Sequence, residues 1–159
     1  MSAKNSGPVL FTQTDTVVNF NPTPGTLGVR VGQVFGAVNG TITLNTSFDG
    51  SVAPPAFKAT GNAVVLDTDG DQILFDVVFT GQFSNPPLAP PAPTPPVVVA
   101  AGSYTAAYTV SQATGKYTGI QGRTFNGVGA ATQPAQTQTT GSAFTQIFGT
   151  LNKGQGPPK

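Results

Sequence analysis

The fold of this chain is decided by an alternating stretch, VNGTITLNTSF, at residues 38–48. Its apolar side chains, Val38, Ile42, Leu44 and Phe48, stand at even positions, and the positions between them hold asparagine, threonine and serine. Because successive side chains of a β-strand point to opposite faces, this alternation predicts a strand with one buried and one solvated face.

The same two-residue period recurs along the chain. Helices are disfavoured, because the sequence has 20 Gly, 15 Pro and no Glu, and no 11-residue window holds a helical apolar stripe free of Gly or Pro. Turn signals such as Asp49-Gly50 and Asp69-Gly70 separate the alternating segments. Eight strands are therefore predicted, at residues 9–20, 27–36, 38–48, 57–67, 72–83, 102–111, 121–131 and 142–151.

An even number of strands joined by short turns favours an all-β fold, and specifically an eight-stranded antiparallel barrel. Closure into a barrel would also remove the exposed strand edges that a weakly charged chain tolerates poorly. The alternative is a jelly-roll or another β-sandwich. The length of 159 residues predicts a single domain over residues 1–159.

A proline-rich insertion interrupts the pattern at residues 85–96, where seven of twelve residues are Pro. Such a segment prefers the extended polyproline II conformation. We expect a stiff surface loop, and the alternative is a strap over the barrel mouth or an arm onto a neighbouring subunit. Gly/Pro-rich tails are expected at residues 1–8 and 152–159.

The composition removes most catalytic chemistry. The chain contains no His, Cys, Glu or Trp, which excludes a Ser-His-Asp triad, a thiolate nucleophile and the common zinc sites. We therefore expect a protein that is not an enzyme and that needs no cofactor. Charged residues make up only 8% of the chain and the net charge is +1, so no nucleic-acid partner is expected.

The 23 threonines suit an extracellular or surface-exposed protein, and solubility must come from hydroxyl and amide groups. No apolar run approaches the ~18 residues of a membrane span, so none is expected. The first residues, MSAKNSG, lack the apolar region of a signal peptide.

A family resemblance enters at residues 102–127, GSYTAAYTVSQATGKYTGIQGRTFNG. A strand, a turn of the form Thr-Gly-Lys-Tyr-x-Gly-x-x-Gly and a further strand resemble the allene-oxide-cyclase-like barrels, a superfamily that includes dirigent proteins and spirotetronate cyclases. Upstream, the segments DGDQILF at 69–75 and FTG at 79–81 resemble the preceding hairpin, so the likeness covers about residues 62–130. The resemblance implies an oligomeric barrel with an aromatic lumen that holds few polar groups.

The turn itself has a structural reason for its spacing. Gly115, Gly119 and Gly122 permit positive φ angles and close approach of the chain where the strand reverses. We expect Tyr117 and Ile120 to tuck under this turn and close one end of the barrel.

The candidate catalytic residues are Asp76, Tyr104, Tyr108 and Arg30. Asp76 lies in mid-strand and faces solvent in the simplest interpretation. If it instead lies in an apolar lumen, its pKa would rise and it could act as a general acid, with Arg30 or Arg123 as its partner. Tyr104 and Tyr108 share a strand face and could line such a lumen, or serve as ordinary core residues.

Three aspartates, Asp67, Asp69 and Asp71, superficially suggest a calcium loop. The glycine comes one place too early for that pattern and the final Glu is missing, so a hairpin turn is the better interpretation. Weak Ca²⁺ binding is the alternative.

The segment 73–79 is apolar on both faces, which indicates a second covering layer and hence a homo-oligomer. The sequence therefore favours a non-catalytic, self-associating barrel of a surface, matrix, filament or virion-decoration type. The first alternative is a cofactor-free cyclase or isomerase acting on a hydrophobic small molecule in the lumen. The second alternative is a carrier of a small hydrophobic ligand.

Overall fold

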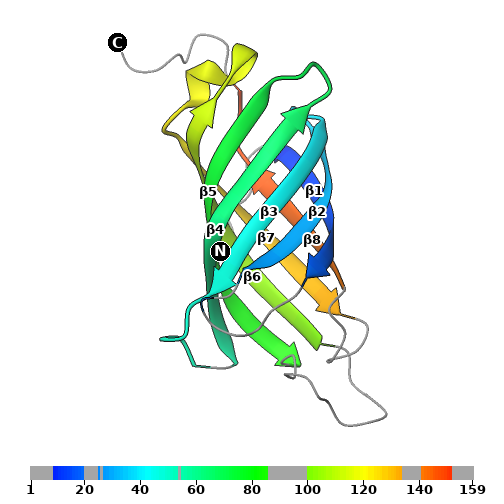
Figure 1. Cartoon of the computed structure of the whole chain (residues 1–159), viewed down its shortest axis with the longest axis vertical. Helices are drawn as coiled ribbons and strands as arrows, with labels where there is room; N and C mark the ends of the chain where they lie inside the picture. The colour runs from blue at the N-terminus through cyan, green and yellow to red at the C-terminus, as the bar shows by residue number, and fades with distance from the viewer. Residues whose placement is uncertain are drawn as a thin grey trace.

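The computed structural model describes residues 9–19, 25, 27–53, 55–85, 100–133 and 141–151. Within them, eight strands pair in sequence order, and β1 pairs with β8 to close the sheet into a barrel (Figure 1). All neighbouring pairs are antiparallel, which confirms the predicted barrel over the sandwich. The strands are β1 (Val9–Asn19), β2 (Gly28–Gly36), β3 (Gly40–Phe48), β4 (Ala56–Asp67), β5 (Gln72–Asn85), β6 (Ala100–Ala113), β7 (Thr124–Gln133) and β8 (Gly141–Phe148).

Each predicted strand corresponds to an observed one, with ends that differ by at most three residues. One difference has a local cause: the predicted turn after β6 contains a short 3₁₀ helix, η2 (Gly115–Ile120), which delays the start of β7 to Thr124. Gly115 and Gly122 have φ angles of +56° and +86°, so these two of the three expected glycines occupy left-handed positions, whereas Gly119 lies within η2 without a positive φ.

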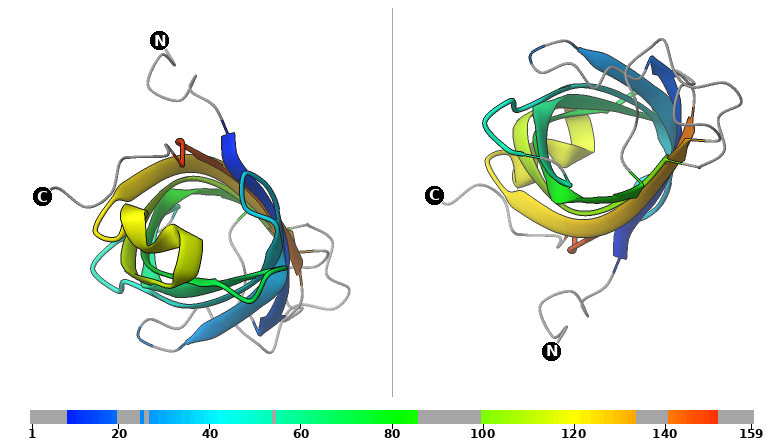
Figure 2. Two further views of the ribbon diagram at one scale, coloured as in Figure 1. Left: turned by 90° about the horizontal axis from the view of Figure 1, so that it is seen from above. Right: turned by 90° about the horizontal axis from the view of Figure 1, so that it is seen from below.

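The two ends of the barrel differ. At one end, η2 lies over the opening (Figure 2), and its Tyr117 and Ile120 are buried as predicted. The connections 37–39 and 68–71 lie at this same end, whereas residues 49–53 lie at the other (Figure 1). The barrel is therefore plugged at the η2 end by its own chain.

Side chains fill the lumen. Its aromatic rings contact one another along the barrel, from Phe11, Phe75 and Tyr108 through Phe79 and Tyr104, with centroid separations of 5.1–6.2 Å. Phe57 and Phe83 stack at 4.6 Å and continue the column towards the end opposite η2. Inward glycines make room for the rings: a Cβ at Gly129 would lie 2.7 Å from the ring of Tyr104.

Apart from Asn85, the proline-rich insertion at 85–96 lies outside the described residues, as do the tails at 1–8 and 152–159. In the part of the chain that the structure describes, no helix has the length and apolar character needed to cross a membrane.

Candidate functional site in the barrel lumen

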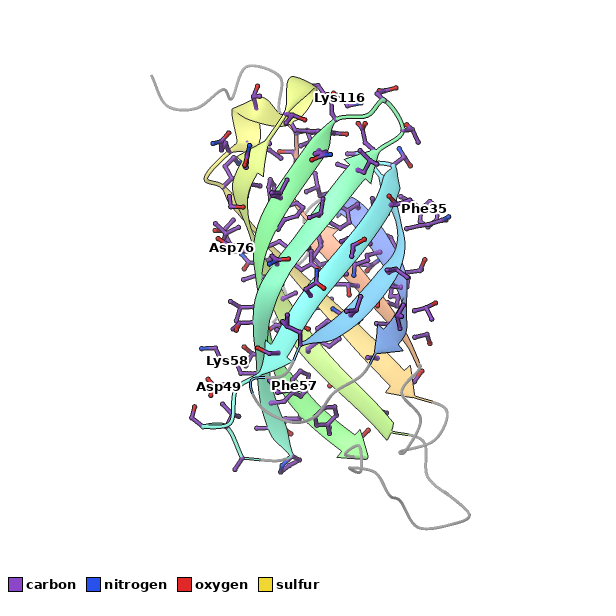
Figure 3. All side chains as sticks on the ribbon, viewed as in Figure 1. Phe35, Asp49, Phe57, Lys58, Asp76 and Lys116 are labelled. Carbon is purple, nitrogen blue, oxygen red and sulfur yellow. The ribbon has the colours of Figure 1, made fainter. Side chains whose placement is uncertain are left out.

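The structure separates the four predicted site residues. Tyr104 and Tyr108 of β6 are buried and point into the lumen, where Arg30 of β2 also lies. Asp76 of β5 is exposed and points outward from the wall (Figure 3), which agrees with the simplest interpretation of its position and removes it from the lumen. The alternative grouping of Asp76 with Arg30 is therefore wrong, because closure of the barrel turns the Asp76 face of β5 outward.

Arg30 forms an ion pair with the carboxylate of Asp15 on β1. Its Oδ1 atom lies 3.6 Å from Nε of Arg30, and the Asp15 side chain is fully buried. Gln13, two residues earlier on the same strand face, donates a hydrogen bond from Nε2 to Oδ2 of Asp15. The sequence held a signal for this placement: Thr12, Thr14 and Thr16 occupy the opposite face of β1, and a hydroxyl-rich face marks the solvent side.

Two further hydrogen bonds link other polar side chains of the lumen to the aromatic column. The Tyr108 hydroxyl donates a 2.8 Å hydrogen bond to Oε1 of Gln13, and both residues are fully buried. Tyr104 and Thr145 join their hydroxyls at 2.7 Å. The guanidinium of Arg30 lies over the ring of Phe79, 4.8 Å from its centroid, a cation–π arrangement.

Burial disfavours the charged form of each titratable group in this cluster, but the net pKa shift differs from group to group. Loss of hydration raises the pKa of Asp15, and the opposing effects of Arg30 and Gln13 only partly offset it. Burial works against the charge of Arg30, but the Asp15 carboxylate and the two tyrosines outweigh it and raise the pKa of the guanidinium. Burial likewise raises the pKa of Tyr108 far above its usual value, so its hydroxyl stays protonated and serves as a donor.

One pair of polar atoms in the lumen is incompletely bonded. Oδ1 of Asp15 and Nε of Arg30 are buried and make no hydrogen bond, although they face each other as an ion pair. Such atoms usually mark a functional group or an ordered water. The cluster can hold a proton or orient a small polar group, but the rings of Phe79, Tyr104 and Tyr108 pack closely against it.

The three aspartates of the suggested calcium loop are bonded within the chain. Lys116 of η2 places Nζ 2.8 Å from Oδ2 of Asp67 and 2.6 Å from Oδ2 of Asp69, so an ammonium occupies the position between the carboxylates. The backbone N–H groups of Asp69 and Asp71 donate to Oδ1 of Asp67. Among the described residues, no group of three or more such side chains could hold a metal ion, so the Ca²⁺ alternative is not supported.

Asp67 also anchors the η2 plug. Burial alone would raise its pKa, but hydrogen bonds from Lys116, from Tyr117 and from two backbone N–H groups outweigh burial and hold the pKa of Asp67 well below its usual value. Burial, together with the hydrogen bond to Asp67, raises the pKa of Tyr117 to about 12. Asp67 therefore stays charged and Tyr117 stays protonated over the ordinary pH range, which fits a structural clamp.

The outer wall has a different chemistry. Within the described strands, the charged side chains that point outward are Lys58 and Asp76, and most of the others are threonine, serine, asparagine, glutamine or valine. Two shallow depressions of about 520 and 380 Å³ lie on this wall, the first over β7, β8 and β1 and the second over β5, β6 and β7. The outward Leu74 and Val78 of β5 have no covering layer among the described residues.

Comparison of the chain with family models, with curated proteins and with solved structures gives no match. The allene-oxide-cyclase-like resemblance therefore stays a prediction beyond the barrel architecture itself.

Proposed function

We propose that this protein is a non-catalytic, self-associating β-barrel of a surface, matrix, filament or virion-decoration type. The observation that carries the proposal is the contrast between a lumen packed with its own side chains and an outer wall almost without charge. In a lumen-based enzyme or carrier, the polar residues of the barrel face a space for substrate. Here the polar side chains of the lumen, Gln13, Arg30, Tyr104, Tyr108 and Thr145, contact one another or Asp15.

The outer wall supports self-association. Net charge keeps soluble proteins apart, and this chain has a net charge of +1 with few charges on its strands. Eight large apolar side chains are exposed among the described residues, including Phe35 and Phe144. Exposed apolar surface of this kind marks an interaction site when it is contiguous. An extracellular or surface-exposed location fits the same composition.

The test is the mass and shape of the full chain in solution. We expect light scattering to give a mass that rises with protein concentration to a dimer or a larger assembly, and negative-stain imaging to show discrete or extended particles. A chain that stays monomeric at several hundred micromolar would overturn the proposal.

A second candidate is a small-molecule function in the lumen, as a cofactor-free cyclase or isomerase or as a carrier. The incompletely bonded Asp15–Arg30 pair favours it, with Tyr104 and Tyr108 beside that pair and Asp15 as the lumen carboxylate in place of Asp76. Native mass spectrometry of the protein purified without denaturant tests it. A bound apolar compound that Arg30→Met releases would favour the second candidate over the first.

A further inference from the structure

The exposed apolar side chains of the outer wall are concentrated on three neighbouring strands. Six of the eight come from β8, β1 and β2 or from the residue directly before β2, and only Leu66 and Val78 lie elsewhere. The six are Val9, Val18, Leu27, Val31, Phe35 and Phe144. Because β8 pairs with β1 and β1 pairs with β2, these side chains share one side of the barrel, which we call the β8–β1–β2 face.

This face includes a depression of about 520 Å³. The strand register places Phe144 between Ala130 of β7 and Thr14 of β1, and places Ser142 between Thr132 and Thr16. The wall is hollowed here because Ala130 and Ser142 are small, while Phe144 stands at the side of the hollow. The residues that line it include two alanines, Ala130 and Ala143, and three threonines, Thr14, Thr16 and Thr132.

A projecting side chain lies on the same face. Phe35 of β2 is 48% exposed and extends outward from the wall (Figure 3). Phe35 pairs with Thr12 of β1. The next residue on the same face of β1 is Thr14, which borders the depression. A convex aromatic group and a concave site therefore lie side by side on the β8–β1–β2 face, separated by β1.

The charges of this face point to the kind of partner. Among the described residues of β8, β1 and β2, no charged side chain points outward, because Asp15 and Arg30 both face the lumen. A charged partner would lose hydration there without gaining a counter-charge. A second copy of this chain presents the same uncharged face and meets no like-charge repulsion.

We propose that the β8–β1–β2 face is a twofold interface between two copies of this chain, with Phe35 of each copy seated in the depression beside Phe144 of the other. With a twofold axis near β1, each copy inserts its Phe35 into the depression of the other copy. The same surface then contributes from both copies, as an isologous interface requires. The inference rests on the proposed self-association and names the surface that performs it. Buried aromatic anchors that fill pockets commonly contribute most to such interfaces.

Sedimentation velocity on the full chain tests the face. Phe35→Asp and Phe144→Asp each place a charge at the interface, and we expect each to raise the dimer dissociation constant by about 30-fold or more. Val78→Asp is the matched control, because Val78 is an exposed apolar residue on β5, beyond the face, and its variant should associate like the parent chain. Thermal unfolding of each variant verifies that the barrel is intact.

The outcomes separate this inference from the proposed function. If the parent chain associates and all three variants associate equally, the protein self-associates through another surface and the inference fails alone. If Val78→Asp weakens association as much as the other two, the face is not specific and the inference again fails. A parent chain that is monomeric at every concentration overturns both.

Disulfide trapping gives a second measurement, because the chain has no cysteine of its own. In one chain, Phe35 and Ser142 are separated by β1 and stand in different rows, too far apart for an internal disulfide. We expect Phe35→Cys with Ser142→Cys to form covalent dimers under mild oxidation, and Val78→Cys with Ser142→Cys to form few. Equal trapping of the two pairs would overturn the interface, as would covalent linkage of Phe35→Cys with Ser142→Cys within a single chain.

Discussion

The Tyr117 hydroxyl donates a 2.7 Å hydrogen bond to Oδ2 of Asp67 and thereby joins residues that are 50 positions apart in the sequence. The same carboxylate oxygen lies 2.8 Å from Nζ of Lys116. Since Asp67 ends β4 and the other two residues belong to η2, this clamp holds the plug over one end of the barrel.

Removing the donor of this bond should loosen the plug. We expect Tyr117→Phe to lower the free energy of unfolding by about 1.5–3 kcal/mol, the range for a hydrogen bond to a charged group. Chemical denaturation followed by circular dichroism measures it. Thr68→Ala, an exposed change in the neighbouring turn, serves as the control and should alter stability by less than ~0.5 kcal/mol. A stability loss that is equal in the two variants would contradict the clamp.

The clamp also predicts an acid dependence. Because the pKa of Asp67 is lower in the folded protein than in the unfolded chain, its contribution to stability is present above the unfolded value of about 3.9. That contribution is lost as the pH falls through the folded pKa. We expect the melting temperature of the parent chain to fall more steeply than that of Asp67→Asn between pH 5 and pH 2.

Burial raises the pKa of Asp15, so acid changes its contribution to stability in the direction opposite to that of Asp67. The contribution of Asp67 is therefore taken from the difference between the melting curves of the parent chain and of Asp67→Asn. Asp76→Asn is the control, and its melting curve should follow that of the parent chain. Parallel acid profiles for the parent chain and Asp67→Asn would refute this assignment.

Gly115 is required for two reasons that can be separated. Its φ of +56° disfavours any side chain, and a Cβ there would overlap the carboxylate of Asp71. Gly70 has a φ of +92°, but a Cβ there would meet no atom within 4 Å, so this position carries the backbone cost alone. We expect Gly70→Ala to cost about 1 kcal/mol and Gly115→Ala about 2–3 kcal/mol. Equal costs, measured by denaturant unfolding, would show that Asp71 moves aside freely.

The lumen ion pair gives the largest expected effect. Arg30→Met leaves the carboxylate of Asp15 buried without its counter-charge and should cost about 3 kcal/mol. The double variant Asp15→Asn with Arg30→Met removes both charges and should recover most of that loss, because a neutral packed core replaces a buried ion pair at little cost. Denaturant unfolding of both variants measures this, with Asp76→Asn as the exposed control. A double variant as unstable as Arg30→Met would show that the pair does not act as a unit.

The strands were predictable because their alternation is local. The segment 38–48 repeats its period over eleven residues, and the observed β3 occupies most of it. The burial of Tyr117 and Ile120 was predictable for a similar reason, since the glycines beside them require a tight reversal of the chain. The short helix within that reversal was not predicted, because six residues carry no helical period.

The lumen chemistry was not predictable from β5, where Leu74 and Val78 are apolar and Asp76 lies between them on the same face. A strand with apolar residues on both faces does not reveal which face is inside. The sequence also does not show that Asp15 contacts Arg30, because that contact depends on the register between β1 and β2.

The sequence by itself determined the eight strands and the absence of the residue types that most catalytic sites need, since these follow from local period, turn residues and composition. Only the tertiary structure decided which carboxylate is buried, which charges neutralise each other and which side of the barrel remains apolar and exposed. Closure of the sheet is the physical reason, because it assigns every strand face to the lumen or to the solvent at once, and a strand with apolar residues on both faces, such as β5, does not carry that information.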